Sequence, residues 1–121
     1  MPNQEVIAQI LDLLETMEEG MDYVKQKLEE LNIEGTITVL TDLTSAFIEI
    51  EKSISSMLEK LPENKIIEKA GKLSTAFDIM VKEYESTNRQ KVYEIMQFTL
   101  EPTFKNWKDE LGEIMKPLIL S

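Results

Sequence analysis

Hydrophobic residues recur at alternating steps of three and four along the first quarter of the chain. Between Val6 and Leu31 they fall at positions 7, 10, 14, 17, 21, 24, 28 and 31. This spacing is that of an α-helix with one buried stripe. Asn3 precedes the pattern and is a suitable N-cap, and Gly20 within it permits either a close approach of another backbone or a bend of the helix. The pattern therefore predicts a first long amphipathic helix.

The segment 36–41, Thr-Ile-Thr-Val-Leu-Thr, resembles a β-strand when it is considered alone. It is rich in β-branched residues and alternates polar with apolar positions. A longer helical pattern contains it, however, because the three-four spacing continues through Ile37, Leu40, Leu43, Phe47, Ile50, Ile54, Met57 and Leu61. Each threonine costs a helix only some tenths of a kcal/mol. The sequence therefore predicts a second helix here and not a strand.

Two further helices are predicted after Pro62, whose fixed φ suits the first turn of a helix. The third carries a stripe of Ile66, Ala70, Leu73, Phe77, Met80 and Tyr84. The fourth runs from about Arg89 to Pro117, with Trp107 in its stripe. The expected fold is an all-α, up-down-up-down four-helix bundle in one domain, residues 1–121, built from hairpins at about 3–61 and 62–119.

A weak internal repeat relates the two hairpins. Asn32 aligns with Asn88 and Leu40 aligns with Met96, but Leu43 then aligns with Leu100, so the register slips by one residue. The slip falls beside Pro102, which disfavours a regular helix because proline lacks an N–H and clashes with the preceding turn. A π-bulge that holds one extra residue, or a restart of the helix at Pro102, would relieve the clash. We expect the last helix to be kinked or broken near Pro102.

Composition excludes several kinds of chemistry. The chain has no Cys and no His, which removes disulfides, thiolate chemistry, imidazole bases and the common zinc sites. The sequence shows no signal segment and no apolar run long enough to span a membrane, so we expect a cytoplasmic protein. No cofactor motif is present, and the pattern predicts a protein without enzymatic activity.

Charge is distributed unevenly along the chain. The net charge is −10, and residues 1–61 hold 13 acids against 4 lysines. Such an acidic half disfavours nucleic acid and membrane surfaces as partners. Solubility explains the acidity best, and an acidic face that attracts a basic protein partner is the alternative. The densest carboxylate group is Glu15, Glu18, Glu19 and Asp22. A solvated helix face explains this group best, and a carboxylate-only metal site is the alternative.

Apolar residues outside the predicted stripes are candidates for partner binding. Tyr23, Ile48 and Ile79 fall on the outward sides of their helices, although isolated exposed apolar residues are ordinary. The segment 91–100 has apolar residues in nearly every direction, including Tyr93 and Phe98. Such a helix is typical of a central position in the bundle. The alternative is that one side of it lines a groove for an incoming helix.

The order of parts resembles the flagellin export chaperones of the FliS family. The first helix is leucine-rich with an internal glycine, the turn "EELNIEG" is acidic, and the last helix carries "NWKDEL". The resemblance implies a small, acidic, cytoplasmic bundle that holds a secretion substrate. The family's tyrosine-containing arm is missing and "EEG" replaces its Tyr-Asp-Gly, so the resemblance assigns no binding residue. The chain is also similar to small helical proteins of low-GC bacteria.

Three hypotheses follow from these observations. The first is a protein-binding bundle, in the form of an export chaperone or adaptor, that captures a basic or amphipathic-helical segment in an apolar groove. The second is a self-assembling structural protein that uses spare apolar surface on the fourth helix or the tail. The third is a carboxylate-only metal-binding protein. The sequence leaves open whether the protein is a monomer or a homodimer.

Overall fold

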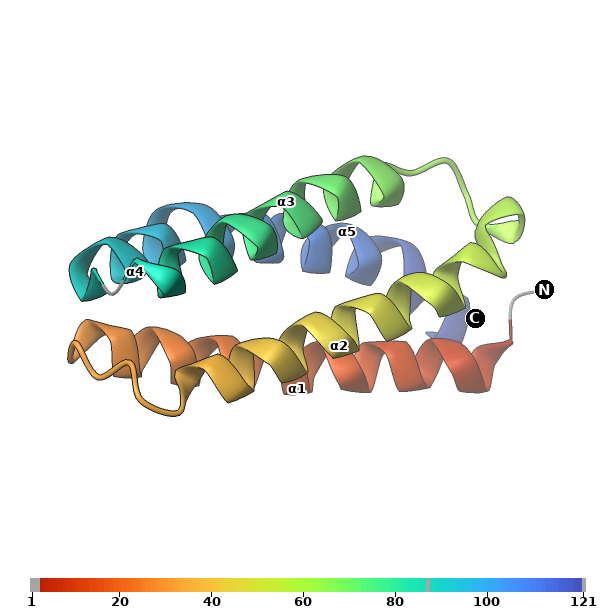
Figure 1. Ribbon diagram of the computed structural model, residues 1–121. Helices are drawn as coiled ribbons and strands as arrows, with labels where there is room; N and C mark the ends of the chain where they lie inside the picture. The colour runs from red at the N-terminus through yellow and green to blue at the C-terminus, as the bar shows by residue number, and fades with distance from the viewer. Residues whose placement is uncertain (1–2, 87, 121) are drawn as a thin grey trace.

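The computed structural model describes residues 3–86 and 88–120 and folds them into a four-helix bundle (Figure 1). The elements are α1 (Gln4–Glu29), α2 (Thr36–Ser55), η1 (Leu58–Lys60), α3 (Ile66–Glu85), α4 (Arg89–Ile95), η2 (Met96–Leu100) and α5 (Glu101–Leu120). The described residues contain no β-strand. The predicted fold class is confirmed; the first two residues and the last one of the predicted domain lie outside the described residues.

The four helices surround one core in the order α1, α2, α3 and the α4–α5 helix. The turns inside the two hairpins lie at one end of the bundle, and the α2–α3 connection lies at the other, near both chain ends (Figure 1). Three aromatic contacts fill the middle of the core, with ring centroids 5.1 Å apart for Phe47 and Trp107 and 5.7 Å apart for Phe47 and Phe77. Trp107 is fully buried, which confirms its predicted core position.

The two helices of the first hairpin form as the periodicity predicts, but both predicted stripes extend past the helices. Leu31 is exposed after the end of α1, and Met57 and Leu61 follow the end of α2 at Ser55.

The side chain of Asn3 accepts hydrogen bonds from the backbone N–H groups of Glu5 and Val6, and so caps α1. A Cβ at Gly20 would lie only 3.0 Å from the Leu43 side chain. The glycine therefore allows the close approach of α1 and α2 that the sequence suggested.

The strand-like segment is the first turn and a half of α2, and it starts one residue earlier than the predicted stripe. Gly35 has a φ of 82°, a left-handed conformation that favours glycine, and it turns the chain into the helix. Thr36 is buried, and its hydroxyl lies 2.7 Å from the Tyr84 hydroxyl on α3. Ile37 is exposed. The prediction that Ile37 begins the core stripe was wrong, because Thr36 has a polar partner inside the bundle.

The second hairpin starts later than predicted. Pro62 lies in the α2–α3 connection and not in the first turn of α3, which begins at Ile66. The backbone N–H groups at that start find acceptors elsewhere: the Asn64 side chain accepts from Ile66, and Glu110 Oε2 on α5 accepts from Lys65 at 2.8 Å. A carboxylate from another helix therefore performs the capping role.

The last helix is helical at every residue from Arg89 to Leu120, and it contains one π turn at Met96–Leu100. The backbone N–H of Glu101 donates to the carbonyl of Met96, five residues earlier. This is the π-bulge that the register slip suggested, and it lies in the interval between Met96 and Leu100 where the repeat gains one residue. The helix does not break near Pro102, and a kink there remains a prediction.

No helix in the described part of the chain is both long enough and apolar enough to cross a membrane.

Candidate functional site

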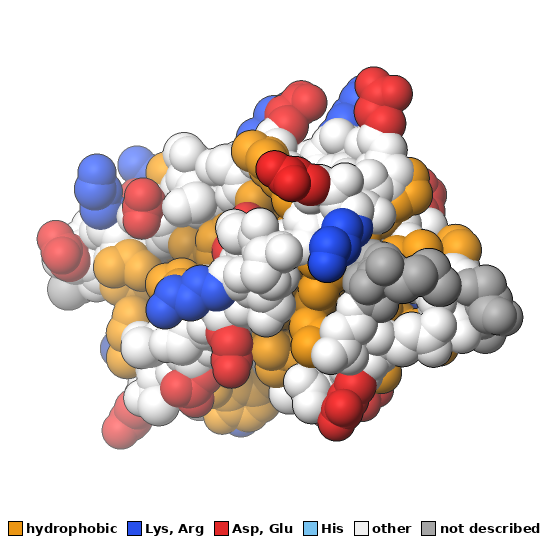
Figure 2. All heavy atoms as spheres, turned by 90° about the vertical axis from the view of Figure 1, so that its right-hand side faces the viewer, with side chains coloured by type: hydrophobic (Ala, Val, Ile, Leu, Met, Phe, Trp, Pro, Cys, Tyr) orange, Lys and Arg blue, Asp and Glu red, His pale blue; other side chains and the backbone are white. Residues whose placement is uncertain are grey.

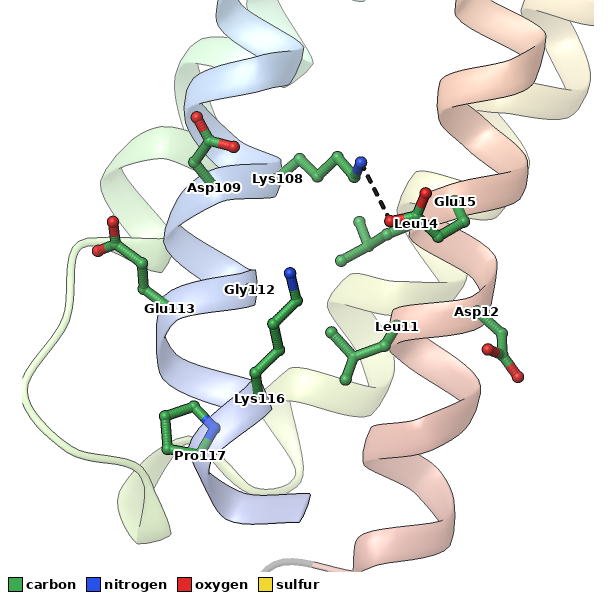
Figure 3. A pocket seen from close by; sticks show the side chains of 10 residues that line it. All are labelled: Leu11, Asp12, Leu14, Glu15, Lys108, Asp109, Gly112, Glu113, Lys116 and Pro117. Atoms are coloured by element: carbon green, nitrogen blue, oxygen red, sulfur yellow. Dashed lines mark ion pairs between the residues drawn. The ribbon is translucent and has the colours of Figure 1, made fainter. Parts of the chain in front are cut away.

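An open groove with a volume of about 560 Å³ lies between α1 and α5 (Figure 3). It lies along the outer side of the bundle where the first and last helices meet. Its lining residues are Leu11, Asp12, Leu14, Glu15, Lys108, Asp109, Gly112, Glu113, Lys116 and Pro117.

The groove has an apolar floor from α1 and a gap on α5. Leu14 is buried and Leu11 is partly buried against the core. Gly112 faces the groove from α5 and contributes no side chain. A Cβ there would be 3.7 Å from Cε of Lys116, so the lysine chain lies over the glycine. In Figure 3, Lys108 extends across the space between the helices toward α1, and Lys116 extends along α5 toward Gly112.

Lys108 holds one end of the groove closed. Its ammonium group lies 3.2 Å from Glu15 Oε1 and also pairs with Glu18. Burial by itself lowers the pKa of Lys108, but the hydrogen bonds to Glu18 and Glu15 outweigh burial and raise it. Lys108 therefore stays charged, and two carboxylates neutralise it. This ion-pair group forms one end of the groove.

Acidic residues flank the groove on both sides. Asp12 and Glu15 line it from α1, and Asp109 and Glu113 line it from α5, against two lysines in all. In Figure 3, Asp109 and Glu113 on α5 and Asp12 on α1 point away from the cavity, toward the solvent on either side of it. Lys116 forms no ion pair with the described residues. An apolar floor with acidic edges can hold a segment that has apolar side chains on one side and cations at its flanks.

The predicted carboxylate group is divided by the fold. Glu15 and Glu18 turn toward α5 and bind Lys108. Glu19 and Asp22 are exposed on α1. No group of three or more potential ligand side chains among the described residues is arranged to hold a metal ion. The hypothesis of a carboxylate-only metal site therefore receives no support from the geometry.

The predicted apolar candidates do not form one groove. Tyr23, Ile48 and Ile79 are exposed as expected, but each is on a different helix. Tyr93 is partly buried and packs against the core, whereas Phe98 is 71% exposed on the outer side of the π turn. The segment 91–100 is thus only partly central: Val92, Met96 and Leu100 enter the core, and its outer side is open.

Sequence reasoning missed the groove because its two sides are far apart in the chain. One signal was present: Lys108, Gly112 and Lys116 are spaced by four, which places them on one helix face with a gap in the middle. The sequence pattern did not show that this face meets the end of α1 that carries Leu11 and Asp12.

The fold and the groove define a four-helix bundle with an open groove between its first and last helices. The chain belongs to the family described as a domain of unknown function, DUF8042, whose model matches residues 5–110. No curated protein and no solved structure matches the chain.

Proposed function

We propose that this protein is a non-enzymatic helical bundle that binds another protein by holding an amphipathic segment in the α1–α5 groove. The observation that carries the proposal is the combination of the apolar floor, Leu11 and Leu14, with carboxylates on both rims. Helix-in-groove recognition needs an apolar channel that accepts residues from one face of a helix. The gap at Gly112 supplies room for such a residue.

The charges favour a segment with lysine or arginine beside its apolar stripe. Lys108 is already neutralised by Glu15 and Glu18, so it opposes a cationic segment only weakly. Lys116 is exposed and long, and it can swing away from Gly112 without breaking an ion pair among the described residues. Asp12, Asp109 and Glu113 are then free to attract the incoming cations.

The specific form that we propose is an export chaperone or adaptor in the cytoplasm. The resemblance to FliS-type bundles supports this form. In such a role the groove protects an apolar segment of the client until transfer. A role without enzymatic activity agrees with the lack of histidine and cysteine.

The proposal is tested with a lysine-rich amphipathic helical peptide and a scrambled peptide of the same composition. Fluorescence anisotropy measures the dissociation constant of each. We expect the amphipathic peptide to bind at least tenfold more tightly, and its affinity to fall as salt rises, since exposed charges are screened. Equal binding of the two peptides would overturn the proposal.

A pair of glycine variants locates the site. Gly112→Leu fills the gap between the helices and should weaken peptide binding at least tenfold. Gly71→Leu is the matched control, because a Cβ at Gly71 on α3 has no neighbour within 4 Å. Peptide binding that survives Gly112→Leu would remove the groove from the proposal. Charge reversal of Asp12 and Glu113 to lysine should slow association while thermal unfolding shows that the bundle remains folded.

A further inference from the structure

Four of the eight exposed large apolar side chains in the described part of the chain lie on the face formed by α2 and α3. Their exposed fractions are 41% for Ile37, 48% for Ile48, 65% for Ile67 and 43% for Val81. We call these four residues the α2–α3 patch. The two helices form the near face of the bundle in Figure 1, and they lie on the opposite side from the α1–α5 groove.

The contacts of α2 identify which of its sides belongs to this face. Val39 and Leu43 approach Gly20, so that side of α2 faces α1. Thr36 and Phe47 contact Tyr84 and Phe77, so the other side faces α3. Ile37, Thr41, Thr44 and Ile48 follow one another at helical spacing along this second side.

The contacts of α3 give the matching result. Lys69 and Glu83 form ion pairs with Glu110 and Lys91, so that side of α3 faces the last helix. Tyr84 and Phe77 are on the side that faces α2. Ile67, Ser74 and Val81 are spaced by seven along this side, which places all three in one line.

The polar groups between the patch residues are suited to being covered. The Thr41 hydroxyl donates to the carbonyl of Ile37, and the Thr44 hydroxyl donates to the carbonyl of Leu40. Hydroxyls that are already hydrogen-bonded within their helix lose little when water is excluded. The charges nearest to the patch are of both signs: Glu51 and Lys52 lie on α2, and Asp78, Lys82 and Glu85 lie on α3.

We propose that the α2–α3 patch binds a second copy of this chain and forms a two-fold symmetric dimer. A chain with a net charge of −10 repels its own copies, so self-association requires a face with little charge. Around the patch, Glu51, Asp78 and Glu85 are nearly balanced by Lys52 and Lys82, so this face holds little of the net charge. A basic partner, in contrast, is attracted to the acidic groove on the other side, so this proposal does not depend on the proposed function.

The area of the face agrees with a modest dimer. Two helices of 20 residues lie side by side, and such a face measures about 30 Å by 20 Å, or about 600 Å² per protomer. The total of about 1,200 Å² is at the lower end of specific interfaces. We expect dissociation in the micromolar range and not an obligate dimer.

The positions of the patch residues favour an antiparallel arrangement. The Phe47–Phe77 contact sets the register of the two helices and places Ile48 near the level of Ser74. Ile67 and Val81 lie seven residues to either side of Ser74, about 10 Å each way. Consider a two-fold axis that lies in the interface, perpendicular to α2 and α3, at the level of Ile48. This axis brings Ile48 against Ile48 of the second copy, and Val81 against Ile67 of the second copy.

Cysteine cross-linking tests this arrangement cleanly, because the chain has no native cysteine. Under mild oxidation we expect Ile48→Cys to form a disulfide with its own copy at least tenfold faster than Tyr23→Cys or Phe98→Cys. These two controls place a cysteine at exposed apolar positions on other faces. Ile67→Cys and Val81→Cys should cross-link readily when the two variants are mixed and poorly when each is alone.

Analytical ultracentrifugation over a micromolar to millimolar range gives the second readout. The protein should change from monomer to dimer, and Ile48→Asp should keep it monomeric with an unchanged thermal unfolding profile. A strictly monomeric protein over the whole range would overturn the proposal. A dimer that cross-links faster through Phe98→Cys would also overturn it, if both Ile48→Cys and the mixture of Ile67→Cys with Val81→Cys were slower.

Discussion

Trp107 on α5 donates a hydrogen bond from its indole nitrogen to Glu51 on α2, with Nε1 and Oε1 3.3 Å apart. The bond joins the two hairpins at the edge of the aromatic core. Burial raises the pKa of the Glu51 carboxyl, and the hydrogen bond from Trp107 opposes this effect only in part. The charged form of Glu51 is therefore less favourable in the folded protein than in the unfolded chain.

We expect Glu51→Gln to stabilise the protein at neutral pH. A carboxyl whose pKa is raised by folding contributes stability below its unfolded pKa, and this contribution is lost as the pH rises through the folded pKa. Glutamine can still accept from Trp107 and carries no charge. The gain should be roughly 0.5–1 kcal/mol at neutral pH and should shrink as the pH falls toward the unfolded pKa of Glu51. Urea unfolding at several pH values measures it.

Glu49→Gln is the control for this prediction, because it removes the same charge from an exposed position on the same helix. A similar gain in both variants would mean that reduced net charge, and not the burial of Glu51, is responsible.

The capping role of Glu110 predicts the opposite pH dependence. The hydrogen bond from the Lys65 backbone N–H lowers the pKa of Glu110, burial opposes this, and Lys69 lowers it further. A carboxyl whose pKa is lowered by folding contributes stability above its unfolded pKa and loses it as the pH falls through the folded pKa. Glu110→Ala should cost about 1–2 kcal/mol at neutral pH. The difference from the native protein should disappear in acid.

Glu113→Gln serves as the comparison for Glu110, because Glu113 is exposed on the same helix. Hydrogen exchange at the first turn of α3 gives an independent readout, since loss of the cap should free these amides first. If Glu110→Ala leaves this turn protected, Glu110 does not cap α3.

Gly20 on α1 and Gly71 on α3 should respond differently to alanine. A Cβ at Gly71 has no neighbour within 4 Å, and φ at this position is not positive. Gly71→Ala should therefore stabilise α3 by roughly 0.5–1 kcal/mol and raise the melting temperature by a few degrees. A Cβ at Gly20 meets the Leu43 side chain at 3.0 Å. Gly20→Ala should gain less or lose stability, and an equal gain would show that α1 and α2 separate easily.

The sequence predicted the helices well because the buried stripe repeats over many turns. The same period was strong enough to outweigh the strand-like composition of 36–41. The residues at which individual helices begin and end were less predictable. Thr36 is buried in place of Ile37 because the Tyr84 hydroxyl on α3 bonds to it. Periodicity within one helix contains no information about such a partner.

The candidate site was predicted less well, because it depends on which helices are neighbours. Glu15 and Glu18 appeared as part of one acidic face, yet Lys108 binds both from a position about ninety residues away. The groove needs Gly112 opposite Leu11, and hydrophobic spacing does not fix that pairing. The outward apolar residues were identified correctly, but only the contacts between helices show that Ile48 lies beside α3 while Tyr23 does not.

The π turn gives the sharpest test of the link between sequence and fold. The second hairpin has one more residue than the first between Met96 and Leu100. The buried residues around this interval, Val92, Met96, Leu100 and Phe104, are each four residues apart. Removing one residue from this turn should return the helix to regular α geometry while both flanking stripes stay in the core. Pro102 opposes regular geometry, so the deletion should be made together with Pro102→Ala.

We therefore expect the Pro102→Ala variant without Phe98 to fold, with a melting temperature within several degrees of Pro102→Ala alone. Deletion of Lys105 in the same background is the control. It removes one residue from a regular α segment, rotates Trp107 and the residues after it by about 100° relative to the preceding turns, and should abolish cooperative unfolding. If the two deletions are equally harmful, the extra residue at 96–100 is not what keeps the two parts of the helix in register.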